Sequence, residues 1–534
     1  MAEKRTIGTL GMLFASIGGI LGSGWLFGPL YAAQLAGPAS LVAWTIGGFA
    51  MILIALTFAE LGAMLPINGG IARHALFSYG RTSGFLISLC AWLTFIVITA
   101  TEVQAVMQYS TIYLPFLTER TPDHSHPLTT IGYACAAGLW LVFALINWIG
   151  IRLFSVINNW LTWLKIVLII VVSIALYSLA FDFKNLDDIK EGGFAPMGMT
   201  GIFQALAYGG VIYAFTGFQH SSVAAGDSRN PQRDIPLAAF GSIVICLVFY
   251  LLIQLAFLGA LGGDSLSHGW KTLQFKDDVG PLAGLAMKLG AGWLFIVIFV
   301  GAIASPLGCG MINLGSCQRL TRGMSHDGFV PRRLGRIGRF HTPPWAIAIT
   351  FPIGLFLFLP FPGWQELVAF LATVVVLAYA VGPIGVMALR RQLPDQQRPF
   401  HLPMAGVICP IAFIICGLLM HWAGWTIVWK LTATVLGTGL IFVLLQVGRK
   451  PLDLREACWI PLLLLGIATL TLLGTHGGLG YISPWINIGL VAAWCLVVYG
   501  IAWFTAIPPE ETRMHVNAAF EADQADYDAV LDTE

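Results

Sequence analysis

The feature that most constrains this chain is a series of apolar runs of about 20 residues, each long enough to cross a lipid bilayer. The stretch from Ile166 to Leu179, part of one such run, contains no charged residue. Only 10% of all residues are charged, against about 25% in soluble domains, which excludes an ordinary water-soluble globular protein. Strands of a membrane barrel alternate over roughly ten residues, and these runs do not. The sequence therefore predicts an all-α polytopic membrane protein.

The apolar runs predict 14 transmembrane helices. We place them at 8–34, 38–65, 83–117, 128–149, 155–181, 199–224, 234–261, 281–312, 343–360, 364–389, 405–423, 426–448, 457–475 and 484–506. Of the 28 Lys and Arg residues, 20 fall on the side that holds the N-terminus, 7 on the other side and one inside the bilayer. Because cytoplasmic loops carry the excess of positive charge, both termini are expected in the cytoplasm.

Other features favour a plain membrane protein without a cofactor or a metal site. The nine cysteines show no CxxC spacing, so we interpret them as packing residues. A net charge of +1 offers no basic surface for nucleic acid. Residues 507–534 form an acidic tail, which we expect to be cytoplasmic and disordered.

Two predicted helices carry residues that favour an interruption at mid-depth. The first span contains Gly18-Gly19-Ile20-Leu21-Gly22-Ser23-Gly24, and each glycine lowers helix propensity by about 1 kcal/mol relative to alanine. The sixth span contains Tyr213-Ala214-Phe215-Thr216-Gly217 at a comparable depth. A glycine pair alone indicates close helix packing. Matching interruptions five spans apart instead indicate an inverted-repeat transporter with its substrate site at the membrane midplane.

Interrupted backbone predicts the chemistry of that site. Lipid offers no hydrogen bonds, so unwound backbone must line a cavity or meet a ligand. The amides of Ser23 and Gly24, at the positive end of the following half-helix, suit a carboxylate. The carbonyls of Ile20, Tyr213 and Thr216 suit an ammonium group. Together they predict a site for the zwitterionic head of an α-amino acid.

Over roughly its first 450 residues the chain resembles the amino acid-polyamine-organocation (APC) permeases, and within them most closely the bacterial aspartate-proton symporters. The motifs that carry the resemblance are Gly22-Ser23-Gly24-Trp25-Leu26-Phe27, Ala59-Glu60-Leu61-Gly62-Ala63, Asn230-Pro231-Gln232-Arg233-Asp234 and Arg398-Pro399-Phe400. The expected fold is a LeuT-like 5+5 inverted-repeat core, with repeats at 8–181 and 199–389. Four additional helices follow, in pairs at 405–448 and 457–506.

The resemblance also implies roles for individual residues. Ser23 and Gly24 would hold the substrate carboxylate, Tyr213 would be an aromatic gate, and Gly22, Phe215 and Gly217 belong to the interrupted segments around them. Thr99 and Asn313 fall where relatives contact the substrate side chain. For these two, an interhelical hydrogen bond is an equally good interpretation.

Lys165 is the one Lys or Arg that we place inside the hydrocarbon, and an ionisable residue there is functional by default. By resemblance to proton-coupled members of the family, it would replace a sodium ion beside the first and eighth spans. Glu102 on the third span is a second candidate proton carrier. His220 and Arg73 are candidates for contacting the side-chain carboxylate of a substrate.

The sequence thus predicts a transporter of the bacterial inner membrane that takes up an acidic amino acid, such as aspartate or glutamate, with protons and by alternating access. One alternative is an obligatory amino acid exchanger, in which Lys165 is structural. Another is an amino acid sensor that does not transport. No HExxH, CxxC or P-loop motif suggests an enzyme. Substrate specificity, proton number and oligomeric state stay open.

Overall fold

The structure is a computed structural model that describes residues 7–67, 69–119, 126–149, 151–187, 192–262, 265–266, 269–275, 280–338, 342–361, 363–446 and 454–531. Its helices are α1 (Thr9–Ile20), α2 (Gly24–Ala36), α3 (Ser40–Met64), α4 (Gly70–Ser110), α5 (Thr130–Ile149), α6 (Ile151–Ala180), α7 (Gly198–Ala207), α8 (Val211–Ala214), α9 (His220–Val223), α10 (Pro231–Gly259), α11 (Pro281–Lys288), α12 (Gly292–His326), α13 (Arg332–Gly335), α14 (Pro344–Leu357), α15 (Trp364–Tyr379), α16 (Val381–Gln392), α17 (Ala405–Trp422), α18 (Trp425–Gln446), α19 (Trp459–Leu473), α20 (Pro484–Thr505) and α21 (Pro509–Leu531).

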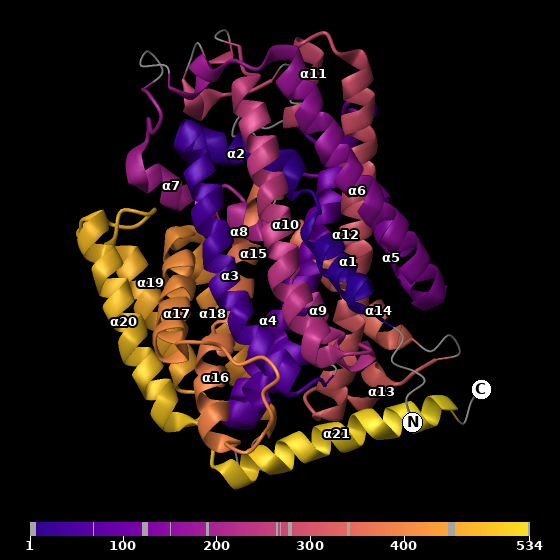
Figure 1. The fold of residues 1–534 in the computed structure, drawn as a ribbon, viewed down its shortest axis with the longest axis vertical. Coiled ribbons are helices and arrows are strands. Elements are labelled where there is room, and N and C mark those ends of the chain that lie inside the picture. The colour runs from indigo at the N-terminus through magenta and orange to yellow at the C-terminus, as the bar shows by residue number, and fades with distance from the viewer. Residues whose placement is uncertain are drawn as a thin grey trace.

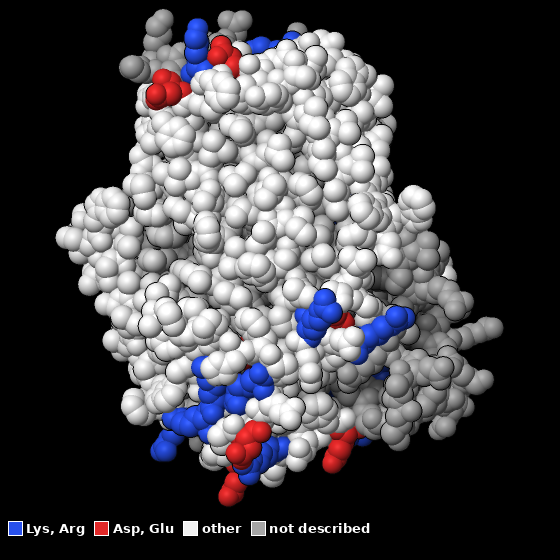
Figure 2. Space-filling view, viewed as in Figure 1, with Lys and Arg blue, Asp and Glu red and all other residues white. Residues whose placement is uncertain are grey.

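The described chain is helical, as predicted, and most of its long helices run side by side along one axis (Figure 1). Within the described residues, ten helical stretches are long and apolar enough to cross a membrane. Three shorter apolar helices, α1, α14 and α19, accompany them. Figure 2 shows a broad band without charged side chains between charged ends. A band of this kind matches the hydrocarbon layer of a bilayer.

The short helices α1, α2, α8 and α9 lie at the centre of the bundle, where α3, α4, α10, α12 and α15 surround them. Helix α10 packs along both α1 and α3, and α4 packs along both α12 and α15. Helices α17 to α20 pack against one another at one side of this core (Figure 1). Both chain ends lie at the same end of the bundle (Figure 1).

Two predicted span boundaries were wrong. The predicted span 281–312 is two helices, because Gly290 adopts a φ of +68° that ends α11, and α12 then continues to His326. The third span was predicted at 83–117, but α4, which runs from Gly70 and bends where Gly80 has a φ of +71°, ends at Ser110. Its first part, residues 70–79, is a separate short helix, which we call the loop helix. Apolar residues continue past Gly290 and past Ser110, which hid both helix ends.

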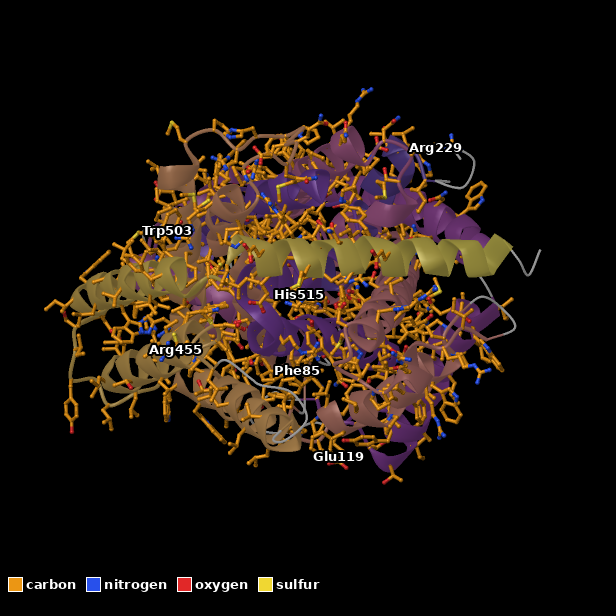
Figure 3. All side chains as sticks on the ribbon, turned by 90° about the horizontal axis from the view of Figure 1, so that it is seen from below. Phe85, Glu119, Arg229, Arg455, Trp503 and His515 are labelled. Carbon is orange, nitrogen blue, oxygen red and sulfur yellow. The ribbon has the colours of Figure 1, made fainter. Side chains whose placement is uncertain are left out.

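The expectation of a disordered C-terminal tail was also wrong, because residues 509–531 form α21. Thr512, Val516 and Ala519 are buried, and their spacing of four and three residues places them on one helix face. The Thr512 hydroxyl donates to the Phe77 carbonyl of the loop helix at 3.0 Å. Figure 3 shows α21 lying across the middle of this end of the molecule. The acidic average of the tail concealed that face, and the structure describes the side chains of the tail only as far as Ala522.

One side chain ties the start of the tail to the bundle. The Gln392 amide, which is completely buried, donates to the Ile507 carbonyl at 2.7 Å and to the Ser78 carbonyl at 3.1 Å. The Ile507 amide donates to the same Ser78 carbonyl at 3.1 Å. The loop helix, α16 and the chain leading into α21 therefore share one set of hydrogen bonds.

Replacing Gln392 with Leu should loosen α21, because the Ile507 carbonyl loses its side-chain donor and the Ser78 carbonyl keeps only the Ile507 amide. We expect trypsin to cleave after Arg513 about twofold to tenfold faster in purified Gln392→Leu protein, which corresponds to the net value of one hydrogen bond. Gln34→Leu is the matched control, since Gln34 donates to the Leu273 carbonyl far from α21. Equal cleavage rates in the two variants would show that Gln392 does not hold the tail.

Candidate substrate-binding site

The first span is broken in the middle of the bundle. Helix α1 ends at Ile20 and α2 begins at Gly24, and Leu21 between them has a non-helical ψ of 73°. The Gly22 amide folds back to the Ile20 carbonyl at 2.9 Å. A Cβ atom at Gly22 would lie 2.0 Å from Oε1 of Glu102. A side chain at Gly22 would displace the Glu102 carboxylate, so glycine here allows that carboxylate to approach the backbone closely.

The sixth span is broken at two points. Helix α7 ends at Ala207, and Gly210 with a φ of +83° leads into the four residues of α8. A series of turns then follows Ala214 until α9 begins at His220. Within these turns Gly217 has a φ of +143°, which a side chain would disfavour. Both predicted interruptions are present.

The two broken segments touch each other. A Cβ atom at Gly217 would lie 2.6 Å from the Ile20 nitrogen, and one at Gly24 would lie 2.9 Å from Cβ of Ala214. No other residue type fits at either contact without a shift of the backbone. The glycines thus bring the free peptide groups of both spans into one place.

A carboxylate already binds the backbone amide that the break leaves without a helical partner at the start of α2. The backbone N–H of Ser23 donates to both oxygens of the Glu102 carboxylate, at 2.9 and 3.1 Å. The Tyr213 hydroxyl donates to the same carboxylate. All three residues are buried. Glu102, which comes from the third span, therefore sits where the sequence predicts a substrate carboxylate.

The Ser23 side chain extends this network. Its hydroxyl lies 2.9 Å from the Tyr213 hydroxyl and accepts a hydrogen bond from the Trp364 indole at 2.8 Å. Trp364 is the first residue of α15 and is 1% exposed. The start of α2, α8 and α15 are therefore joined by side chains around one buried hydroxyl.

The last carbonyls of α1 also have side-chain donors. Lys165 Nζ donates to the Gly18 carbonyl at 2.9 Å, and the Cys309 thiol donates to the Gly19 carbonyl at 3.1 Å. Lys165 is fully buried on α6, and a Cβ atom at Gly308 of α12 would lie 2.7 Å from its Nζ. The ammonium group therefore lies between the fifth, first and eighth spans.

Tyr250 of α10 connects the two breaks. Its hydroxyl lies 3.0 Å from the Ile20 carbonyl and 2.7 Å from the Ala214 carbonyl, so one donor faces both. The Tyr213 carbonyl accepts from the amide and the hydroxyl of Thr216, at 2.9 and 2.6 Å. The carbonyls of Ile20 and Tyr213, which the sequence suggested for an ammonium group, hold internal donors in this conformation.

The other predicted residues differ in their surroundings. Thr99 and Asn313 are buried, and each donates to a carbonyl of its own helix, at 2.8 and 2.9 Å. Oδ1 of Asn313 has no hydrogen-bond partner among the described residues, and neither bond is interhelical. Phe215 packs edge-on against Trp44 and Tyr250, with ring centroids 5.8 and 5.2 Å away. The structure therefore gives Phe215 a packing contact with α3 and α10.

His220 directs one ring nitrogen at the broken first span. Its Nδ1 lies 2.8 Å from the Ser316 hydroxyl, and its ring stacks on Phe95. Its Nε2 is buried without a hydrogen-bond partner among the described residues, and a Cβ atom at Gly19 would lie 2.4 Å from it. Arg73, the other candidate cation, instead pairs with Asp327 at 3.6 Å.

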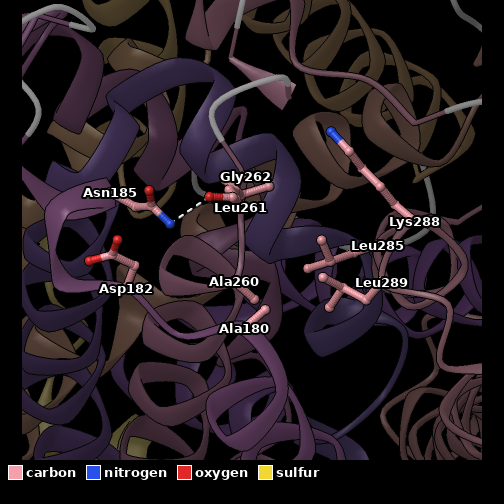
Figure 4. Close-up of a pocket in the computed structure, with 9 residues that line it drawn as sticks. All are labelled: Ala180, Asp182, Asn185, Ala260, Leu261, Gly262, Leu285, Lys288 and Leu289. Atoms are coloured by element: carbon pink, nitrogen blue, oxygen red, sulfur yellow. Dashed lines mark hydrogen bonds between the residues drawn. The ribbon is translucent and has the colours of Figure 1, made fainter.

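A separate cavity lies away from the breaks, at the end of the bundle opposite the termini. Its volume is about 280 Å³, and its polar lining residues are Asp182, Asn185 and Lys288 (Figure 4). The Asn185 amide is already bonded to the Leu261 carbonyl. None of the predicted site residues lines it. Across the described residues, no three His, Cys, Asp or Glu side chains gather closely enough to hold a metal ion.

Comparison with known proteins identifies the family to which this arrangement belongs. The family model described as amino acid permease matches residues 7–447, most of the chain. The chain belongs to the amino acid permease family. This permease is therefore a multi-pass membrane protein that transports amino acids.

Two relatives from Bacillus subtilis (strain 168) match this permease over nearly its whole length. One is named an aspartate-proton symporter and is 32% identical over 513 residues, 95% of this chain and 97% of the relative. The other is named the glutamate/serine transporter AimA and is 32% identical over 508 residues, 93% of each chain. The branched-chain amino acid permease BcaP of the same organism is 25% identical over 448 residues.

Three residues of the network were missed by the sequence analysis: Tyr250, Cys309 and Trp364. A tyrosine hydroxyl in the apolar run of α10 needs a partner, so Tyr250 could have been noticed. Trp364 begins a predicted span, where tryptophan usually marks the membrane interface. Cys309 resembles any packing cysteine. Only the fold shows which side chains reach the breaks.

Replacing Tyr250 with Phe should destabilise the permease, because two buried carbonyls lose their shared donor. We expect a loss of about 1–3 kcal/mol in the free energy of unfolding, seen as a lower Tm of the purified protein in detergent. Tyr499→Phe is the matched control, since the Tyr499 hydroxyl has no hydrogen-bond partner among the described residues. If the two variants have the same Tm, the Tyr250 hydroxyl does not stabilise the breaks.

Proposed function

We propose that this permease takes up an acidic amino acid together with protons, by alternating access around the two broken helices. The observation that carries the proposal is the Glu102 carboxylate on the Ser23 amide. The same amide is the best-placed group for the carboxylate of an amino acid. Two carboxylates cannot share one buried amide, because like charges in a low-dielectric site repel strongly.

Protonation of Glu102 resolves this conflict. The neutral acid group binds the amide less strongly than the carboxylate does, since hydrogen bonds to ionised acceptors are about twice as strong. The substrate carboxylate then replaces Glu102 on Ser23 while Glu102 keeps its proton. Substrate and proton therefore enter the site together, which is the requirement for symport.

Lys165 supplies the positive charge for whichever carboxylate is ionised. Its ammonium group donates to the Gly18 carbonyl in the last turn of α1, next to the same break. An uncompensated buried charge is costly, so the site favours states that hold one ionised carboxylate beside one ammonium group. We assign Lys165 to proton coupling with Glu102, in the volume where a sodium ion would otherwise be needed.

The proton also offsets an electrical cost. Moving a monoanion into a cell held at 100 mV, negative inside, costs about 2.3 kcal/mol, and one accompanying proton cancels this cost. An acidic amino acid carries that net negative charge. Coupling to protons therefore matters more for acidic substrates than for neutral ones.

His220 supports the acidic character of the substrate. Its unpartnered Nε2 beside Gly19 is a donor position for a side-chain carboxylate near the head-group site. The names of two relatives, one for aspartate and one for glutamate and serine, agree with this assignment. Thr99 and Asn313, both buried, are the further contacts with the substrate side chain that we propose.

For the membrane arrangement we propose 14 spans, with repeats at 8–181 and 199–389 and four additional helices. The matching breaks in α1–α2 and α7–α9 support the two repeats. Both chain ends lie at one end of the bundle (Figure 1), which agrees with an even number of spans and with cytoplasmic termini in the inner membrane.

Proteoliposome uptake of radiolabelled aspartate tests the proposal. An inwardly directed proton gradient should drive accumulation by the wild-type protein, with the other amino acids as competitors.

Glu102→Gln should abolish gradient-driven accumulation and keep counterflow, because an amide mimics the protonated acid. Lys165→Ala should reduce gradient-driven uptake at least tenfold, a change that corresponds to about 1.4 kcal/mol. Glu119→Gln, at an exposed loop position, is the matched control.

Each alternative has its own result in these assays. Uptake that requires internal amino acid and ignores the gradient would identify an obligatory exchanger. Substrate binding without uptake or counterflow would identify a sensor. Undiminished gradient-driven uptake in Lys165→Ala would remove Lys165 from proton coupling.

A further inference from the structure

We infer that Trp364 is the residue that closes the site toward the end of the bundle away from the termini, and that its bond to Ser23 makes this closure part of substrate handling. The inference rests on the proposed function and adds a gating residue to it. The evidence lies in what the indole covers.

Trp364 covers one face of the half-helix α2. Ser23, Phe27 and Tyr31 are spaced four residues apart, which places them along one side of the helix. The Trp364 ring stacks on Phe27 and Tyr31, with centroids 4.8 and 5.5 Å apart, and its N–H reaches the Ser23 hydroxyl at 2.8 Å. A single side chain of α15 thus spans two turns of α2.

The same ring also meets the broken sixth span. It stands edge-on to Tyr213, with ring centroids 5.5 Å apart. A Cβ atom at Gly210 would lie 3.0 Å from the ring. Trp364 therefore fills the space between the start of α2 and α8, directly beside the Ser23 and Tyr213 hydroxyls.

This position has a mechanical consequence. Helix α2 runs from the Ser23 amide toward the end opposite the termini (Figure 1). An amino acid that approaches the amide from that end must displace the indole, because Trp364 bonds to Ser23 and is itself buried together with the rings of Phe27 and Tyr213. Displacement breaks the N–H bond to Ser23. Opening on this side and access to the carboxylate-binding residue are therefore one event.

Removing the indole N–H should shift the resting population toward the conformation open on this side. The apparent affinity of a transporter for external substrate depends on the fraction of molecules in the competent conformation. Trp364→Phe keeps a stacking ring and loses the donor. We expect the KM for external aspartate to fall by about twofold to tenfold, and kcat per folded molecule to fall as well, because closure over bound substrate becomes less favourable.

Ser23→Ala provides an independent route to the same effect. It removes the hydroxyl that accepts the indole N–H and leaves the backbone amide in place. The single variants should resemble each other, and the double variant should show much less than the product of their separate effects on KM. Trp459→Phe is the matched control, since Trp459 is a fully buried tryptophan of α19 away from both breaks.

The kinetics separate gating from a structural role. General destabilisation lowers the amount of active protein and leaves KM unchanged. An unchanged or raised KM in Trp364→Phe, or independent effects of the two substitutions in the double variant, would overturn the inference. If Trp364→Phe does not fold, Ser23→Ala alone must lower the KM. Absence of aspartate uptake by the wild-type protein would instead refute the proposed function.

Discussion

The structure depends on the need to satisfy peptide groups that two broken helices leave open at mid-depth. Lipid cannot hydrogen-bond these groups, and each one left unpaired costs free energy. In this permease side chains from surrounding spans meet the open groups: Glu102 on the Ser23 amide, Lys165 and Cys309 on carbonyls of α1, and Tyr250 between both breaks. A substrate can bind one of these peptide groups only where the side chain that occupies it can be released. Each of these hydrogen bonds is therefore a point at which substrate binding can be regulated.

The hydrogen bond that protonation can weaken and the hydrogen bonds that it leaves unchanged come from different spans. The carboxylate of Glu102 changes its affinity for an amide when it binds a proton, so the third span can release the site. The Tyr250 hydroxyl has no such switch in the physiological pH range, and it joins both breaks through α10. This division lets one part of the site respond to protons while the broken helices keep their mutual contact at Gly217 and Ile20.

The sequence predicted the helical class, the two breaks and the buried Lys165, because glycine clusters and a lone charge in an apolar run have direct physical meanings. It did not predict that Glu102 holds the Ser23 amide, since which side chain reaches an amide depends on the packing of distant helices. It placed His220 near the sixth-span break, but its free Nε2 beside Gly19 is visible only in three dimensions. The helical tail was missed because Thr512, Val516 and Ala519 form a face too small to change an acidic average.

Proton uptake during substrate binding tests the exchange of carboxylates on Ser23 most directly. Aspartate is added to the purified permease in a weakly buffered detergent solution while a pH indicator and a binding assay are read together. Competition for one amide predicts that the wild-type protein takes up about one proton for each aspartate bound, and that Glu102→Gln binds aspartate without taking up a proton. Binding by the wild-type protein with no proton uptake would contradict it.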